Sequence, residues 1–144
     1  MRKRAIRMVA WSWLACAWPA SAWAGQDSVP GLWLSADKAA VIEFKACAEP
    51  PGALCGTIVW DKDAGTPMDA CGVMVAKLKT WRDDAWRDGW VHDPRTKKNY
   101  KGVVRTQGDT LLVRAFIGTE LLGETEVLTR STSIPPGCRN RGTP

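Results

Sequence analysis

The residues of this chain best suited to acid–base chemistry lie in one stretch, WRDGWVHDPRTKKNYKGVV, at positions 86–104. It contains the only histidine, His92, and the only tyrosine, Tyr100. His92 beside Asp93 could serve as an oriented base, with Tyr100 as the acid. However, no serine or cysteine in a nucleophile context lies nearby, and adjacent residues of a strand point to opposite faces. Catalysis is therefore the weaker interpretation of this stretch.

A β-hairpin accounts for the same residues. Asp93 precedes Pro94, and aspartate commonly begins a proline-containing turn because its carboxylate accepts a hydrogen bond from the backbone ahead. Gly89 lies within a strand, where a bulge or a close backbone approach is usual. The stretch thus predicts hairpin architecture, and we expect His92 to be dispensable.

Metal binding is disfavoured elsewhere in the chain. The acidic loop DKDAGTPMD (61–69) offers oxygen ligands, but it lacks the bidentate glutamate and the ligand spacing of an EF-hand. A surface turn is the better interpretation of this loop. The sequence contains no C-x-x-C pair and His92 stands alone, which argues against zinc. We expect neither a metal nor a cofactor.

The segment TWRDDAWRDG (80–89) alternates arginine and aspartate between tryptophans. Tryptophan and arginine are enriched where proteins dock, so this segment is a candidate docking surface. A solvated loop whose charges cancel is the favoured alternative.

The N-terminal segment, residues 1–24, has the parts of a bacterial secretory signal peptide. Four basic residues precede an apolar run, Pro19 interrupts it, and small residues specify cleavage after Ala24. The apolar run is shorter than the roughly 20 residues of a membrane-spanning helix. A lipoprotein site at Cys16 is disfavoured, because Trp13 occupies the position that prefers leucine.

Charge gives no reason to expect a nucleic-acid partner. The chain has 20 basic and 15 acidic residues, and the signal segment holds four of the basic ones and none of the acidic ones. The mature chain therefore has 16 against 15, a net charge of +1. Its residues 25–144 are enough for one domain with a single core.

Four cysteines remain after cleavage, an even number that suits an oxidising compartment. Three pairings are open. We favour Cys47 with Cys55, because CAEPPGALC reads as a strand end, a Pro-Pro-Gly turn and a strand start. Cys71 would then pair with Cys138 and tie a central loop to the C-terminal tail.

Short β-prone runs recur along the chain with turn residues between them and without a long helical pattern. They lie at 31–34, 40–47, 54–60, 72–79, 86–93, 98–105, 110–117 and 123–130. The run at 72–79 is the least secure, because its composition also suits a helix. Eight antiparallel strands in sequence order can close on themselves, which removes their edges. We therefore predict an all-β, up-and-down antiparallel barrel of about eight strands.

Alternation predicts which faces are buried. In TLLVRAFI (110–117) one parity is wholly apolar and should face the interior, with Arg114 outside or at a rim. Trp86 and Trp90 share a parity in their strand, and Tyr100 lies across the hairpin from it. Trp60 belongs to the apolar row of the run at 54–60. These four aromatic residues are the candidate ligand contacts near a barrel mouth.

Two short motifs add a resemblance. GLW (31–33) opens the first strand and LTR (128–130) closes the last. This resembles lipocalins, in which a tryptophan from G-x-W plugs the closed end and an arginine packs over its ring. The resemblance assigns barrel closure to Gly31, Trp33 and Arg130.

The whole mature chain is similar to a secreted bacterial family known as domain of unknown function 2147. The matching motifs are GLW, LCGTIVW, WRDGWVHDPRTKKNY, LLVRAFIG and the closing TR. The spacing of W-x-x-G-x-x-x-D-P to a tyrosine is the most specific of them. The resemblance implies a lipocalin-like barrel, and the family has no established activity or catalytic residues.

Together these observations lead us to expect a non-catalytic periplasmic or secreted barrel, which binds at most one small apolar ligand at the mouth opposite Trp33. An envelope protein-interaction module that docks through its Trp/Arg-rich surface is the alternative, and an enzyme ranks third. Large residues such as Phe44 and Trp60 argue for a filled interior, whereas Gly56 and Gly102 argue for room.

Overall fold

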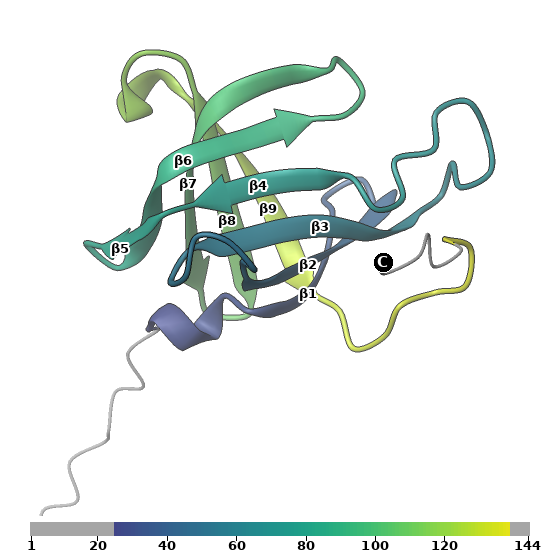
Figure 1. Cartoon of the computed structure of the whole chain (residues 1–144), viewed down its shortest axis with the longest axis horizontal. Helices are drawn as coiled ribbons and strands as arrows, with labels where there is room; N and C mark the ends of the chain where they lie inside the picture. Colours follow the sequence, from purple (N-terminus) through teal and green to yellow (C-terminus); the bar gives the residue numbers. More distant parts are fainter. Residues whose placement is uncertain (1–24, 139–144) are drawn as a thin grey trace, which may run out of the picture.

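The structure, a computed structural model, describes residues 25–138, so the predicted signal segment lies outside the described residues. Nine strands follow one another in this part of the chain (Figure 1). They are β1 (Gly31–Leu34), β2 (Ala40–Ala46), β3 (Leu54–Asp61), β4 (Met74–Leu78), β5 (Thr80–Arg82), β6 (Ala85–Asp93), β7 (Lys98–Gln107), β8 (Thr110–Phe116) and β9 (Glu124–Arg130). Two 3₁₀ turns accompany them, η1 (Gln26–Ser28) before β1 and η2 (Glu120–Leu122) between β8 and β9.

The strands close into a barrel. Consecutive strands pair antiparallel with one another, except β4 with β5, and the circle closes where β1 pairs with β9 and where β4 pairs with β6. β5 follows β4 after a single residue, Lys79, and pairs with the first part of β6. β5 is therefore the one strand added to an eight-stranded meander. The predicted fold is confirmed. The run at 72–79 is also a strand, since its middle part forms β4 between β3 and β6.

Alternation places the apolar side chains inside, as β8 illustrates. Leu111 is fully buried in the core, and Val113 packs against the same cluster two residues on. Arg114, between such inward positions, donates hydrogen bonds to the η2 backbone outside the wall. The pleat of the strand therefore sorts the residues as their parity predicts.

A bulge in β6 changes the expected parity of its tryptophans. The register with β7 shifts between Trp86 and Gly89, and Asp88 has φ of +59°. An extra residue in one strand moves all the following side chains to the opposite face. Trp86, before the bulge, is in the core, and Trp90, after it, therefore lies opposite Lys101 on the outer face. The shared parity predicted for the two tryptophans is wrong.

Gly89 makes this local structure feasible. A Cβ atom at Gly89 would lie 1.8 Å from the carbonyl oxygen of Lys77, so only glycine allows β6 to approach β4 this closely. At Gly56 and Gly102 the nearest obstacle to a Cβ atom is a neighbouring side chain, whereas at Gly89 it is the backbone. A Cβ atom would lie 2.8 Å from the Phe44 ring at Gly56, and 2.6 Å from Val91 Cγ1 at Gly102. These two glycines therefore leave no empty space.

Both favoured disulfides are present. Cys47 bonds Cys55 across the β2–β3 loop, and Cys71 in the β3–β4 loop bonds Cys138 in the C-terminal tail. Within residues 25–138, no helix is long and apolar enough to cross a membrane.

Candidate functional site

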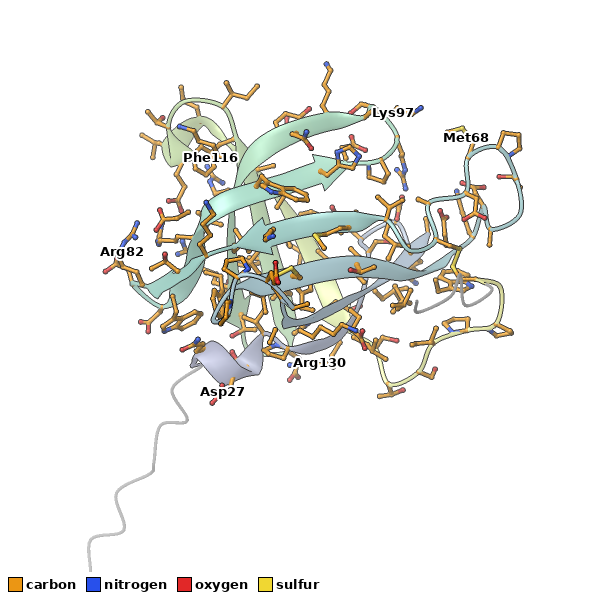
Figure 2. All side chains as sticks on the ribbon, viewed as in Figure 1. Asp27, Met68, Arg82, Lys97, Phe116 and Arg130 are labelled. Atoms are coloured by element: carbon orange, nitrogen blue, oxygen red, sulfur yellow. A yellow bond between two sulfur atoms is a disulfide. The ribbon has the colours of Figure 1, made fainter. Side chains whose placement is uncertain are left out.

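One end of the barrel is closed by the first and last strands. Trp33 is fully buried, and its indole nitrogen donates a hydrogen bond to the Val29 carbonyl at 2.8 Å. The Arg130 guanidinium carbon lies 3.8 Å from the centroid of the Trp33 ring, within cation–π range. The guanidinium also donates to the carbonyls of Ser28, at 2.8 Å, and Pro30, at 3.1 Å. Figure 2 shows Arg130 close to η1 at this end.

Gly31 provides the space for this arrangement. Its φ of +132° is a backbone conformation that residues with a Cβ rarely adopt. A Cβ atom there would also lie 2.6 Å from the nearer guanidinium nitrogen of Arg130. The glycine of G-x-W is therefore required both by the backbone and by the arginine.

The N-terminal turn completes the closed end. Val29, just after η1, is fully buried against the core. The Ser28 and Thr106 hydroxyls lie 2.6 Å apart and share a hydrogen bond, which attaches the turn to β7. Residues from β1, β7 and β9 thus close this end.

The opposite end contains a cavity of about 620 Å³. Its volume falls within the range of roughly 300–1,000 Å³ typical of small-molecule sites. The cavity is bordered by the β1–β2, β6–β7 and β8–β9 loops, and the last two lie at the end of the barrel away from η1 in Figure 1. Its wall is mainly apolar and includes Ile42, Phe44, Ile58, Val75, Val91, Tyr100, Val113, Ala115 and Leu128.

An ion pair joins two of the loops around this mouth. Arg95, in the β6–β7 loop, donates to the Asp37 carboxylate, in the β1–β2 loop. Asp37 also accepts from the Ser35 hydroxyl at 2.7 Å and from the Ala39 amide at 3.1 Å. The Arg95 guanidinium, followed by the Ser35 hydroxyl, lowers the pKa of Asp37 to about 2. Asp37 is therefore ionised at neutral pH.

Asp93 shapes the β6–β7 turn. Its carboxylate accepts from the amides of Arg95, at 2.9 Å, and Thr96, at 3.4 Å, and from the Thr96 hydroxyl at 3.0 Å. Burial opposes ionisation of this carboxyl, but these hydrogen bonds together lower its pKa. The turn chemistry expected for Asp93 before Pro94 is thus observed.

Two glutamates of β9 face the cavity. Glu124 and Glu126 have the parity of Leu128, which is buried in the core, and both line the cavity. The Ala36 amide donates to Glu126 at 3.4 Å. Among residues 25–138, neither glutamate forms an ion pair within 4.0 Å.

The β8–β9 loop forms an apolar lip beside the mouth. Ile117, Leu121 and Leu122 are 76%, 86% and 81% exposed, and Ile117 and Leu122 also line the cavity. The polar groups of η2 point to the barrel wall instead. The Glu120 carboxylate accepts from Arg87 at 2.7 Å and from Arg105 at 3.1 Å. The loop is therefore anchored with its apolar side chains in solvent.

The predicted ligand contacts lie in different places. Tyr100 lines the cavity. Trp86 is 4% exposed and packs in the core, where Trp81 meets it edge-on at 5.9 Å. Trp90 lies opposite Lys77 and Lys101. None of Trp60, Trp86 and Trp90 lines the cavity: Trp86 packs deeper in the core, and the β6 bulge turns Trp90 outward.

Trp60 serves the C-terminal tail instead. Its indole nitrogen donates to the Pro136 carbonyl at 3.2 Å. Leu54 and Ile58, the other members of its apolar row, are buried. The neighbours Val41 and Ile42 of β2 pair with Trp60 and Ile58 of β3, so β3 has one extra residue between these two pairs. This bulge explains why the end of the row leaves the interior.

The site residues that sequence reasoning missed are charged. Glu124 and Glu126 follow the same alternation as Leu128, so parity along β9 was a usable signal. The pair of Asp37 and Arg95, 58 residues apart, had no local signal.

His92 sits at the rim of the mouth and has a simple structural partner. Its Nδ1 lies 2.7 Å from the Asn99 side-chain oxygen, directly across the β6–β7 hairpin. Within the described chain, no three His, Cys, Asp or Glu residues are arranged to hold a metal ion. All four cysteines between residues 25 and 138 are in disulfides.

Comparison with solved structures identifies protein HP1028 from the human pathogen Helicobacter pylori, which belongs to the lipocalin family. The two chains share 14% identity with a TM-score of 0.54, and the match covers 72% of this chain and 83% of HP1028. At this identity the likeness shows the fold alone, a lipocalin-like barrel. No curated protein matches significantly. The model of DUF2147, described as an uncharacterised protein conserved in bacteria, matches residues 31–130, and the chain therefore belongs to that family.

Proposed function

We propose that this protein is a non-catalytic binding protein of an extracytoplasmic compartment, and that its barrel takes up one small apolar ligand through the mouth. The observation that carries the proposal is the cavity of about 620 Å³ with its mainly apolar wall. The contrast between the plugged end and the hollow end also supports it, because a barrel selected only for stability would fill both with side chains.

Two disulfides support the compartment, since such bonds persist where the environment is oxidising. The predicted signal peptide agrees with this proposal. A periplasmic location follows if the signal is cleaved as expected. Intact-mass measurement of the secreted protein should then give a chain that begins at Gly25 or Gln26 and has no thiol to alkylate.

The non-catalytic part of the proposal rests on the surroundings of His92. Its hydrogen-bond partner is the Asn99 amide, which is neither a nucleophile nor a carboxylate that would orient a base. His92→Asn should therefore retain ligand binding. A variant that stays folded and loses binding would overturn this assignment.

The docking alternative has less support on its original surface. Trp86 is in the core, and Arg82 pairs with Asp88 at 2.8 Å. What favours docking is the exposed lip of Ile117, Leu121 and Leu122, which lies beside the cavity. The cavity remains the stronger observation, because it is concave and partly enclosed by three loops.

The direct test is uptake of a neutral apolar probe. N-phenyl-1-naphthylamine becomes fluorescent in apolar surroundings, and we expect saturable binding of one molecule per chain. Native mass spectrometry of protein purified from its own periplasm should in addition show a retained ligand. Absence of saturable binding by the folded protein would contradict the proposal.

A matched pair of variants locates the site. Ala115→Phe places a ring in the cavity and should abolish uptake of the probe. Val127→Phe adds a ring to the neighbouring strand at a position that is 43% exposed on the outer face, and should leave uptake unchanged. Equal loss in both variants would show that the probe binds elsewhere.

A further inference from the structure

The mouth has a charge opposite to that of the chain as a whole. Four carboxylates line the cavity, those of Asp37, Asp93, Glu124 and Glu126, against one cation, Arg95. With His92 neutral the lining has a net charge of −3, whereas the chain after residue 24 has a net charge of +1. Negative charge is thus concentrated where a ligand would enter.

These carboxylates do not all have the same freedom. Asp37 is held by Arg95, and Asp93 is held by its own turn. Glu124 and Glu126 remain without an ion pair in the described chain, although the charge of Arg95 reaches Glu126. A ligand can therefore meet two carboxylates that need no rearrangement to receive it.

The two glutamates lie directly above the apolar wall. Glu126 is opposite Val113 and Glu124 is opposite Ala115 across β8 and β9, while Leu128 continues the same face into the core. Both glutamates are exposed at the rim, so their carboxylates keep their hydration while their strand positions aim them at the cavity. Two charged residues on the cavity face of one strand suit a role in ligand recognition.

We propose that the cavity selects amphiphiles with a cationic, ammonium-type head group, and that Glu124 and Glu126 receive the head while the chain lies against Val113, Ala115 and Leu128. This inference rests on the proposed function and names its ligand class. A carboxylate or phosphate head would instead meet like charges, and Arg95 is already engaged by Asp37.

The experiment compares three probes with the same chain, namely dodecylammonium, dodecanol and dodecanoate, the ionic probes below their micelle concentrations and the alcohol below its solubility limit. Calorimetric titration at neutral pH should show the cation binding roughly tenfold more tightly than the alcohol, with the carboxylate weakest. The preference should decrease at high salt, because the rim is open to solvent. Binding of all three probes with equal affinity, or tightest binding of dodecanoate, would overturn the head-group inference and leave the binding function intact. Failure of all three to bind would count against the proposed function itself.

The double variant Glu124→Gln and Glu126→Gln tests the assignment to these residues. It should remove most of the preference for dodecylammonium, raise the affinity for dodecanoate and leave the affinity for dodecanol unchanged. Glu43→Gln is the matched control, because Glu43 lies opposite in parity to Phe44 on β2 and pairs with Lys45 at 2.9 Å. A preference that survives the double variant, or that falls equally in the control, would refute the assignment.

Discussion

The two ends of the barrel are built on different principles. At the closed end a fully buried indole is covered by an arginine, and the polar groups nearby bond to backbone carbonyls. At the mouth the wall is apolar, the rim is charged, and the contacts are made between loops. Figure 2 shows Arg130 at the first end and Lys97, in the β6–β7 loop, at the other.

This difference separates the end that stabilises the fold from the end proposed to bind the ligand. The closed end gains free energy from tight packing, which is sensitive to the loss of any large side chain. At the mouth, apolar side chains line an open cavity and the charged side chains remain in water. Substitutions there should therefore change the affinity for a ligand more than the free energy of unfolding.

The largest effect should follow loss of the plug. Trp33→Ala removes a fully buried indole and its hydrogen bond to Val29, so the free energy of unfolding should fall by about 3–5 kcal/mol. Denaturant unfolding monitored by circular dichroism measures this. A loss below about 1 kcal/mol would mean that the closed end contributes no more to stability than the mouth does.

Loss of the arginine should cost less. Arg130→Ala removes the cation–π contact and two hydrogen bonds to carbonyls, and we expect a loss of about 1–2 kcal/mol. Arg130→Lys should recover little of it, because an ammonium cannot stack flat on the ring. In the double variant with Trp33→Ala the two losses should not add, since both remove one shared contact. Strict additivity in denaturant unfolding would argue against coupling of the two strands through this contact.

At the mouth, a substitution should affect binding of the probe strongly and the free energy of unfolding only slightly. Ala115→Phe should change the free energy of unfolding by less than about 1 kcal/mol, because the cavity has room for a ring. The same variant should lose binding of the neutral probe. Measuring both quantities on one sample sharpens the comparison, and a large loss of stability would show that the mouth is as tightly packed as the plug.

The smallest effect concerns the loop ion pair. Asp37 has a pKa of about 2 against an ordinary value of 3.8, so its contribution to stability is complete above the ordinary value and is lost as the pH falls through about 2. The pair is largely exposed, with Asp37 42% and Arg95 63% accessible, so we expect less than about 1 kcal/mol. Asp37→Asn should therefore be slightly less stable than wild type at neutral pH, and the difference should shrink as the pH falls through about 2. A constant difference across this window in denaturant unfolding would contradict the assignment.

Sequence reasoning determined the fold because its signals are local and repeated. Alternation along β8, turn residues between the runs, and tryptophan and arginine at opposite ends of the meander all indicate one closed barrel. The disulfide pairing followed from the short loop between Cys47 and Cys55, which left one partner for Cys71. Each of these inferences depends on neighbours along the chain, or on a single closure rule.

Only the tertiary structure decided which residues meet at the mouth. The extra residue between Trp86 and Gly89 depends on how closely β6 approaches Lys77 of β4, and this approach moves Trp90 outside. The pairing of Asp37 with Arg95 joins two loops that become neighbours only when the barrel closes. Local periodicity has no access to such contacts, because a bulge resets parity and loop geometry is set by strands far away in the chain.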